Sequence, residues 1–245
     1  MNRYFIKLAY KGTNYHGWQI QENAHTVQAE LNEKMSLMLG ESINLVGCGR
    51  TDTGVHAREF YAHFEISKKL NELRDLTFRL NGFLPDDIVI YEIFKVPADF
   101  HARFDAKSRT YKYYISIQKN PFLTGQSFYF HGKLDVSKMN EACSVLFNYT
   151  DFTSFSKLHT QTKTNNCKIY KAIWKEDGDE LIFTIQADRF LRNMVRAIVG
   201  TMIEIGSGKL GVQDMKRIIE AKDRSDAGFS VPAEGLFLEA VAYDF

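Results

Sequence analysis

The chain has 245 residues, enough for one large or two modest domains, and its 44% hydrophobic and 25% charged residues are typical of a globular protein. Its net charge of +1 gives no case for nucleic-acid binding, and its three scattered cysteines argue against both a disulfide framework and a zinc site. No apolar run approaches the ~18 residues of a membrane span and the N-terminus has no signal-peptide core, so we expect a cytoplasmic protein.

The first half of the chain alternates between strand and helix patterns. Alternating apolar residues predict a half-buried first strand over 4–10. Thr26 is a suitable N-cap for a helix over 27–39, which Gly40 ends. The remaining expected elements are strands at 43–46, 60–66 and 88–94 and a helix at 73–80 that Asn81 and Gly82 end.

The segment 97–107 has no periodicity, and we place a domain boundary near its end, between an N-terminal domain of residues 1–105 and a C-terminal domain of residues 106–245. The second half repeats the plan of the first. Strands are expected at 111–117, 169–174, 181–187 and 236–243, and helices at 136–146, 190–206 and 215–219. This order predicts an α+β protein of two similar halves, each with mainly antiparallel strands and helices on one side.

One stretch between two predicted strands combines glycines with an arginine and an aspartate: Gly47-Cys48-Gly49-Arg50-Thr51-Asp52-Thr53-Gly54-Val55-His56. The glycines allow unusual backbone angles and the close approach of another chain. An aspartate held between two strands suits a nucleophile or a general base. For an arbitrary Thr-Asp-Thr-Gly sequence, however, a simple Asx-turn in a hairpin would be the favoured interpretation.

This stretch resembles the catalytic loop of the TruA-type tRNA pseudouridine synthases, whose pattern reads roughly Gly-Arg-Thr-Asp-x-Gly-Val-His. Other runs similar to that family follow in family order: Tyr10-Lys11-Gly12-Thr13, Gly17-Trp18-Gln19, Phe100-His101-Ala102-Arg103-Phe104, Arg109-Thr110-Tyr111-Lys112-Tyr113, Phe190-Leu191, Met194-Val195-Arg196, Pro232-Ala233 and Gly235-Leu236. The resemblance implies the pseudouridine synthase fold, in which two α/β halves with mainly antiparallel sheets are joined into one extended sheet, with the active cleft between them.

The resemblance also implies an activity, the isomerisation of uridines in the tRNA anticodon stem-loop, at about positions 38 to 40, with Asp52 as the catalytic residue. This reaction breaks the N1 glycosidic bond, turns the base and joins C5 to C1′. Because it involves no redox step and no group donor, no cofactor is expected. A carboxylate can attack the sugar or the base, or remove a proton during elimination, and the sequence leaves these routes open.

Four further residues match family positions around the aspartate. Arg196 matches an arginine expected to pair with the carboxylate and keep it oriented. Arg50 matches an arginine that helps to extrude the target nucleotide, and Tyr111 matches a tyrosine that stacks on the target base. Leu236 matches a residue that lines the pocket. On pattern alone, ordinary core positions remain open as interpretations of Tyr111 and Leu236.

Basic residues are segregated along the chain. The stretch 157–175 has five lysines and no acid, and 103–119 has five basic residues and one acid. A phosphate-tracking groove would give such segments, although solvated faces produce them too. We expect His101, Arg103 and Arg192 to contact the RNA backbone, with an exposed surface position as the alternative for Arg192. The resemblance implies a homodimer in which one tRNA contacts both subunits.

Two other functions stay open at the level of sequence. One is a non-catalytic RNA-binding or chaperone module descended from such an enzyme, although a pure binder has no need of Asp52, whose carboxylate repels phosphate. The other is an RNA-cleaving enzyme that uses Asp52 with a histidine such as His56. The seven histidines show no metal-ligand spacing. Gly206-Ser207-Gly208-Lys209 lacks the rest of a phosphate-loop pattern and is expected to end a helix.

Overall fold

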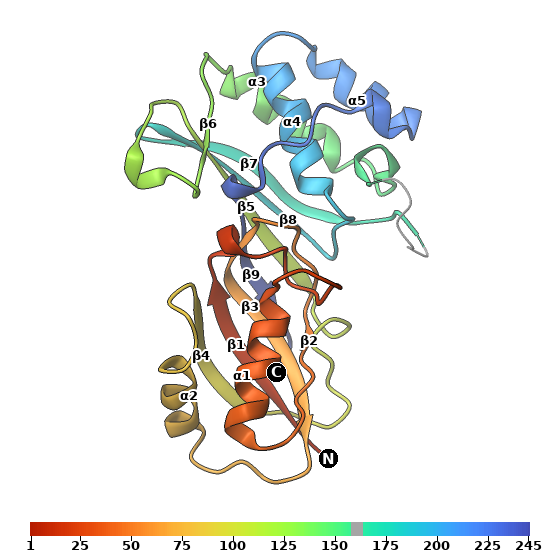
Figure 1. Cartoon of the computed structure of the whole chain (residues 1–245). Helices are drawn as coiled ribbons and strands as arrows, with labels where there is room; N and C mark the ends of the chain where they lie inside the picture. The colour runs from red at the N-terminus through yellow and green to blue at the C-terminus, as the bar shows by residue number, and fades with distance from the viewer. Residues whose placement is uncertain (158–163) are drawn as a thin grey trace. The chain divides into compact units, whose positions relative to one another are not determined.

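The computed structural model describes residues 1–157 and 164–245, which form two compact units (Figure 1). Unit 1 consists of Met1–Lys107 and Leu238–Phe245, and unit 2 consists of Ser108–Phe237. The described residues contain nine strands and five α-helices, so the predicted α+β class is confirmed. No helix in this part of the chain has both the length and the apolar character needed to cross a bilayer.

Unit 1 is built on the central strand β1 (Asn2–Tyr10), which lies between β4 (Ile88–Lys95) and β3 (His56–Ile66). Both pairings are antiparallel, with Leu8 opposite Phe60 in β3. Strands β1 and β3 confirm the period-two patterns of the sequence, in which alternate apolar residues face one side of the sheet, and β4 confirms the strand expected at 88–94.

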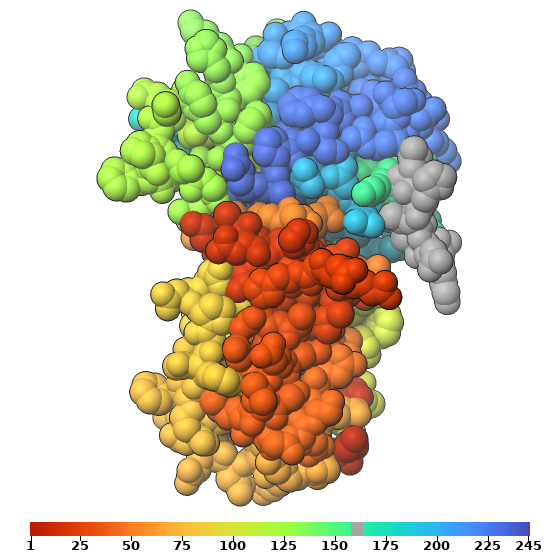
Figure 2. Space-filling view, in the orientation of Figure 1, coloured from red at the N-terminus to blue at the C-terminus, as the bar shows by residue number. Residues whose placement is uncertain are grey.

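Two helices cover one face of this sheet. Helix α1 (Val27–Leu39) begins where Thr26 Oγ1 accepts a hydrogen bond from Ala29 N, and it ends at Gly40 with φ +66°. Its buried side chains are Val27, Leu31, Met35 and Leu39, as the helical spacing predicts. Helix α2 (Leu73–Asn81) packs beside β4, and the space-filling view shows residues of α1 and α2 on the surface of unit 1 (Figure 2).

The strand predicted at 43–46 is largely wrong, because the only strand there is β2 (Val46–Gly47), which pairs with β3. Residues 43–45 instead hydrogen-bond to side chains of α1. Ser36 Oγ accepts from Ile43 N at 2.8 Å, and Asn32 Oδ1 accepts from Leu45 N at 3.0 Å. The polar side chains of the helix thus take the place of a neighbouring strand.

The other face of the sheet carries an aromatic cluster around Phe5, which is fully buried although the alternation in β1 places it on the outer side. Phe100 and Tyr243 lie with their ring centroids 5.4 and 5.7 Å from that of Phe5. Tyr243 Oη also donates to Ala102 O, and Val241 N donates to Glu59 at 3.1 Å. The end of the chain, predicted to lie in the second domain, therefore belongs to unit 1, and the first boundary falls between Lys107 and Ser108.

Unit 2 has the strand order β5-β8-β7, with β6 paired in parallel to β5 and the other two pairings antiparallel. The strands of this unit are β5 (Ser108–Ser116), β6 (Phe128–Tyr129), β7 (Ile169–Asp177) and β8 (Glu180–Ala187). The last strand, β9 (Leu236–Ala242), starts in unit 2 and ends in unit 1. The two-residue strand β6 has no periodic signal and was not predicted.

Helices α3 (Val136–Leu146), α4 (Met194–Gly206) and α5 (Val212–Ala221) pack together in unit 2 (Figure 1). Helix α4 is the most deeply buried of the three. It was predicted from residue 190 but starts at Met194, because Asn193 has a left-handed conformation (φ +67°) that a right-handed helix cannot contain. Single 3₁₀ turns occur at Gly12–Asn14, Pro121–Leu123, Thr153–Phe155, Arg224–Asp226 and Ala233–Gly235.

Candidate active site

The aspartate of the glycine-rich stretch lies in an irregular loop, residues 48–55, that joins β2 to β3. The loop leaves the sheet after Cys48, whose N–H donates to Tyr61 O at 2.7 Å. Asp52 O then accepts from Val55 N at 3.1 Å, which closes a four-residue turn. Gly54, the third residue of this turn, has φ +79°, as a type II turn requires. The half-buried Asp52 is therefore the first residue of a closed turn.

Thr51, immediately before the aspartate, is anchored through both its side chain and its backbone. Its hydroxyl is hydrogen-bonded to Tyr10 Oη at 2.8 Å in a buried position. Its carbonyl accepts from Trp18 N at 3.3 Å. Two independent contacts thus fix Thr51, so the carboxylate of the next residue, Asp52, projects from a restrained backbone.

The segment 11–18 packs against the loop 48–55 and supports it. Tyr15 O accepts from Gly54 N at 3.3 Å, and the Trp18 ring stacks on Phe60 at 4.1 Å. Gly17 has φ +86°, and a Cβ at this position would lie 2.3 Å from Thr51 O. No side chain fits there. The sequence of this segment predicted no role for it, and its contacts with 48–55 show that it supports the loop.

His56 also contributes to this support. It is 1% exposed, and its Nδ1 accepts a hydrogen bond from Gly12 N at 3.0 Å. The imidazole thus holds the start of segment 11–18 against β3. A buried ring with Nδ1 committed to a backbone amide is poorly suited to proton transfer with a bound RNA, so the geometry does not favour the RNA-cleaving alternative.

Arg50 and Arg103 are the exposed basic candidates of unit 1. Arg50 lies in the loop itself, two residues before Asp52. Arg103 lies in a turn at 101–105 that is organised by His101. The ring Nδ1 of His101 accepts from Arg103 N at 3.0 Å, and its backbone N–H donates to Asp105 Oδ2 at 2.6 Å. The contacts of His101 are those of a turn-forming residue, and its RNA-binding role stays a prediction.

A second histidine, His63 in β3, holds the same turn. Its Nδ1 accepts from Ala102 N at 3.1 Å, and its ring lies edge-on to that of His101 with a centroid separation of 4.6 Å. Burial, with smaller contributions from His101 and Arg3, lowers the pKa of His63 to about 4. Burial also lowers the pKa of His101. Both rings are therefore neutral acceptors at physiological pH.

In unit 2, Tyr111 and Tyr113 alternate along β5 but have different environments. Tyr113 is fully buried and donates from Oη to Pro232 O at 2.9 Å. Tyr111 is half-buried, and its ring meets that of Phe190 edge-on at 5.2 Å. Tyr113 is thus the core tyrosine, and Tyr111 is the one with an accessible part. Its stacking role stays a prediction.

Arg196 lies in the first turn of α4 and pairs with the backbone of Val231 in both directions. Its Nε donates to Val231 O at 2.7 Å, and Val231 N donates to Arg196 O at 3.3 Å. Leu236 is buried at the start of β9. Arg192 is exposed just before the helix, and its carbonyl accepts from Lys157 N at 3.1 Å.

The predicted residues are therefore distributed over both units. Unit 1 carries Asp52 and Arg50 in one loop and His101 and Arg103 in another segment, whereas Tyr111, Arg192, Arg196 and Leu236 belong to unit 2. The pairing of Asp52 with Arg196 stays a prediction. The lysine-rich stretch 157–175 is described only in part, because 158–163 lie outside the described residues.

Other motifs of the sequence have structural explanations. In the Gly206–Lys209 run, Ser207 N donates to Ile203 O and Lys209 N to Glu204 O, both at 2.9 Å, and Gly208 has φ +78°, which confirms a helix-ending turn. Cys48, Cys143 and Cys167 are buried free thiols. Burial raises the pKa of both Cys143 and Cys167 to about 12. Among residues 1–157 and 164–245, no cluster of three or more His, Cys, Asp or Glu could hold a metal ion.

Comparison with known proteins gives matches over both units. A model of the family described as tRNA pseudouridine synthase matches residues 7–105 and 148–244, which include every candidate site residue except Tyr111. The tRNA pseudouridine synthase A of Parabacteroides distasonis is 53% identical over 243 residues, which cover 99% of this chain and 96% of that protein. The protein of the same name from Porphyromonas gingivalis is 53% identical over 99% of this chain and 98% of its own. The one from Caldicellulosiruptor bescii is 38% identical over 99% of this chain and 100% of its own.

Proposed function

The chain belongs to the tRNA pseudouridine synthase family, whose members are isomerases, and we propose that it converts uridines of the tRNA anticodon stem-loop, at about positions 38 to 40, to pseudouridine. The N1–C1′ bond of the target uridine breaks, and a C5–C1′ bond forms after the base turns. The proton on C5 leaves, and N1 acquires one, so that substrate and product are isomers.

Asp52 is the catalytic residue in this proposal. The observation that carries it is the anchored turn: a carboxylate in a short closed turn, next to a threonine held at 2.8 Å by Tyr10 and at 3.3 Å by Trp18 N. A restrained carboxylate needs little reorganisation to reach the sugar or the base, and this favours covalent attack or proton removal equally. A binding module would have no need to fix an aspartate in this way.

The remaining candidates take supporting roles. Arg196 pairs with the Asp52 carboxylate and orients it, because a guanidinium offers two parallel donors to one carboxylate. Arg50 helps to extrude the target nucleotide, Tyr111 stacks on the flipped base and Leu236 lines its pocket. Flipping costs a few kcal/mol of stacking, which inserted cationic and aromatic groups offset.

Binding of the RNA backbone is assigned to the exposed arginines Arg103 and Arg192, with His101 shaping the turn that presents Arg103. Each arginine that neutralises a phosphate adds to the salt dependence of binding. The working assembly is a cytoplasmic homodimer in which one tRNA contacts both subunits. Sedimentation velocity of the free protein tests the dimer, and a monomer at micromolar concentration would contradict it.

A non-catalytic RNA-binding or chaperone module is the second candidate. The exposed arginines suit it as well as they suit an enzyme. It differs from the first candidate in one consequence, since it binds tRNA without releasing the C5 proton.

An in-vitro assay separates the two candidates. Unmodified tRNA transcripts carry tritium at C5 of uridine, and matched transcripts replace the uridines at positions 38, 39 and 40 by cytidine. We expect tritium release from the first set and none from the second. Release from the substituted transcripts would contradict the anticodon-stem assignment, and tight binding without release from either set would favour the chaperone module.

A further inference from the structure

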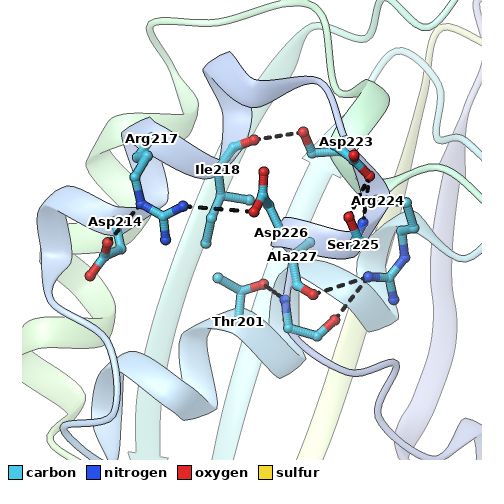
Figure 3. A network of polar contacts seen from close by, with 11 residues as sticks. Thr201, Asp214, Arg217, Ile218, Asp223, Arg224, Ser225, Asp226 and Ala227 are labelled. Atoms are coloured by element: carbon cyan, nitrogen blue, oxygen red, sulfur yellow. Dashed lines mark hydrogen bonds and ion pairs between the residues drawn. The ribbon is translucent and has the colours of Figure 1, made fainter.

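A polar network fixes the segment 227–231 between α4 and the turn that follows α5 (Figure 3). This 227–231 segment contacts α4 at three points. Gly228 N donates to Thr201 Oγ1 at 2.8 Å, Ser230 Oγ accepts from Asn193 Nδ2 at 2.6 Å, and Val231 makes the two-way pair with Arg196.

Arg224 holds the same segment from its other side. Its Nη1 donates to Ala227 O at 3.2 Å and to Gly228 O at 3.1 Å, and its Nη2 donates to Ser230 Oγ at 2.9 Å. Ser230 Oγ therefore receives donors from both Arg224 and Asn193. A single half-buried guanidinium thus ties three residues of the segment together, a task that needs the planar, forked donor set of arginine.

The segment has little freedom to shift toward α4. A Cβ on Gly200 would lie 1.8 Å from Phe229 O, and one on Gly228 would lie 2.6 Å from Thr201 N. The backbone of the segment therefore lies directly on the backbone of the helix. A change in the conformation of residues 227–230 moves Val231, and with it the carbonyl that receives Arg196 Nε.

We propose that Arg224 is a positioning residue for the pseudouridine synthase reaction, which acts by fixing Val231 O and thereby the plane of the Arg196 guanidinium. This inference rests on the proposed function, in which Arg196 orients Asp52. Arg224 itself touches neither substrate nor reacting atoms. With its Nε bound to Val231 O, the guanidinium of Arg196 keeps a defined direction for its two terminal amino groups.

A neighbouring arginine offers a matched control. Arg217 on α5 is exposed and pairs with Asp214 at 3.0 Å and with Asp226 at 3.8 Å, but it makes no hydrogen bond or ion pair with the 227–231 segment (Figure 3). Arg217→Gln removes the same charge from the same surface as Arg224→Gln. The comparison separates the hydrogen-bond network from a general loss of positive charge.

The test uses the full chain with Arg224→Gln, Arg224→Lys and Arg217→Gln, and it measures tritium release from tRNA together with hydrogen exchange of the amides at 228–231. For Arg224→Gln we expect kcat to fall by about tenfold to a hundredfold with KM within about twofold, because misplacement of a catalytic group affects turnover more than binding. Exchange of the Gly228 and Val231 amides rises about tenfold. Arg224→Lys keeps the charge but loses the forked guanidinium donors, so its kcat and its amide exchange lie between those of wild type and Arg224→Gln. Arg217→Gln matches wild type in both measurements.

A double-mutant comparison with Arg196 tests whether Arg224 acts through that residue. In an Arg196→Lys background, Arg224→Gln adds less than about twofold to the loss of kcat, since residues that act through one another are not additive. If Arg224→Gln lowered kcat in the Arg196→Lys background as much as it does in the wild-type background, the proposal would be overturned. In the wild-type background, an unchanged kcat for Arg224→Gln would also overturn it. So would a raised KM with a weaker salt dependence, because that result indicates a phosphate contact. A wild-type chain that releases no tritium would refute the proposed function instead, and the exchange arm would still decide whether Arg224 fixes the segment.

Discussion

At the scale of single residues, the position of Asp52 depends on side chains that belong to other parts of unit 1. Tyr10→Phe removes the hydroxyl bonded to Thr51 Oγ1 and leaves the ring in place. We expect a loss of about 1 kcal/mol in the free energy of unfolding and a fall of about tenfold in kcat, because the turn that carries Asp52 loses one of its anchors. Tyr91→Phe, at an exposed tyrosine, is the control and changes neither quantity. Full activity of Tyr10→Phe would show that the anchor is dispensable.

A second prediction at this scale concerns pH. His63 has a pKa of about 4 in the folded chain, against about 6.5 in an unfolded one, so the unfolded state binds the proton more readily. The free energy of unfolding therefore falls as the pH drops from about 6.5 to about 4, by roughly 2–3 kcal/mol from this group. His63→Asn keeps an acceptor near Nδ1 but does not titrate, and urea unfolding across this range measures the difference. If the free energy of unfolding changed with pH equally in wild type and His63→Asn, the lowered pKa of His63 would be contradicted.

The sequence predicted an irregular loop that carries Asp52 between two strands because this signal is local, with the glycines and the aspartate inside one run. It assigned no role to Trp18, Gly17 or Arg224, because their contacts with 48–55 and 227–231 depend on the fold. It also predicted an RNA contact for His101, which stays a prediction; the Nδ1 of that ring accepts hydrogen bonds from the backbone of its own turn.

At the scale of elements, the close packing of the segment 11–18 on the loop 48–55 requires a glycine at position 17. Gly17→Ala adds a Cβ 2.3 Å from Thr51 O, whereas Gly208→Ala, at a similar φ (+78° against +86°), meets nothing within 4 Å. Both variants incur the cost of about 1 kcal/mol for a side chain in the left-handed region. Only Gly17→Ala should also displace Thr51, lowering activity at least tenfold. Equal activity of the two variants would count against the close packing of these segments.

Element boundaries show where local pattern was sufficient. The limits of α1 and α3 follow from their caps and apolar spacing. The strand at 43–46 failed because Asn32 and Ser36 of α1 satisfy its backbone, and α4 began later than predicted because Asn193 is left-handed. In both cases the apolar pattern is present, but a tertiary contact or a backbone angle determines where the element begins or whether it forms.

At the scale of the whole molecule, the end of the chain returns to the unit in which the chain begins. Tyr243 packs on Phe5 and bonds to Ala102 O, so Tyr243→Ala should lower the free energy of unfolding of unit 1 by about 3 kcal/mol. Tyr170→Ala, at an exposed tyrosine of β7, should stay within about 0.5 kcal/mol of wild type. Urea unfolding checks both, and equal stability of the two variants would contradict the assignment of 238–245 to unit 1.

The sequence predicted two α+β halves from the repeated order of elements, but it assigned residues 106–245 to a single second domain. The apolar alternation of 236–243 identifies a strand without identifying its neighbours. The partners of that strand depend on contacts with Glu59, Phe5 and Ala102, which lie more than a hundred residues away in the chain. Periodicity carries no such information.

The most direct test of the central claim is tritium release from C5-labelled uridine in unmodified tRNA by wild type, Asp52→Asn and Asp86→Asn. Asp86 is an exposed aspartate outside the loop, so its variant controls for the loss of one carboxylate. We predict release by wild type and Asp86→Asn, none by Asp52→Asn, and a Kd for tRNA within about twofold for all three. Release by Asp52→Asn at the wild-type rate would contradict the account.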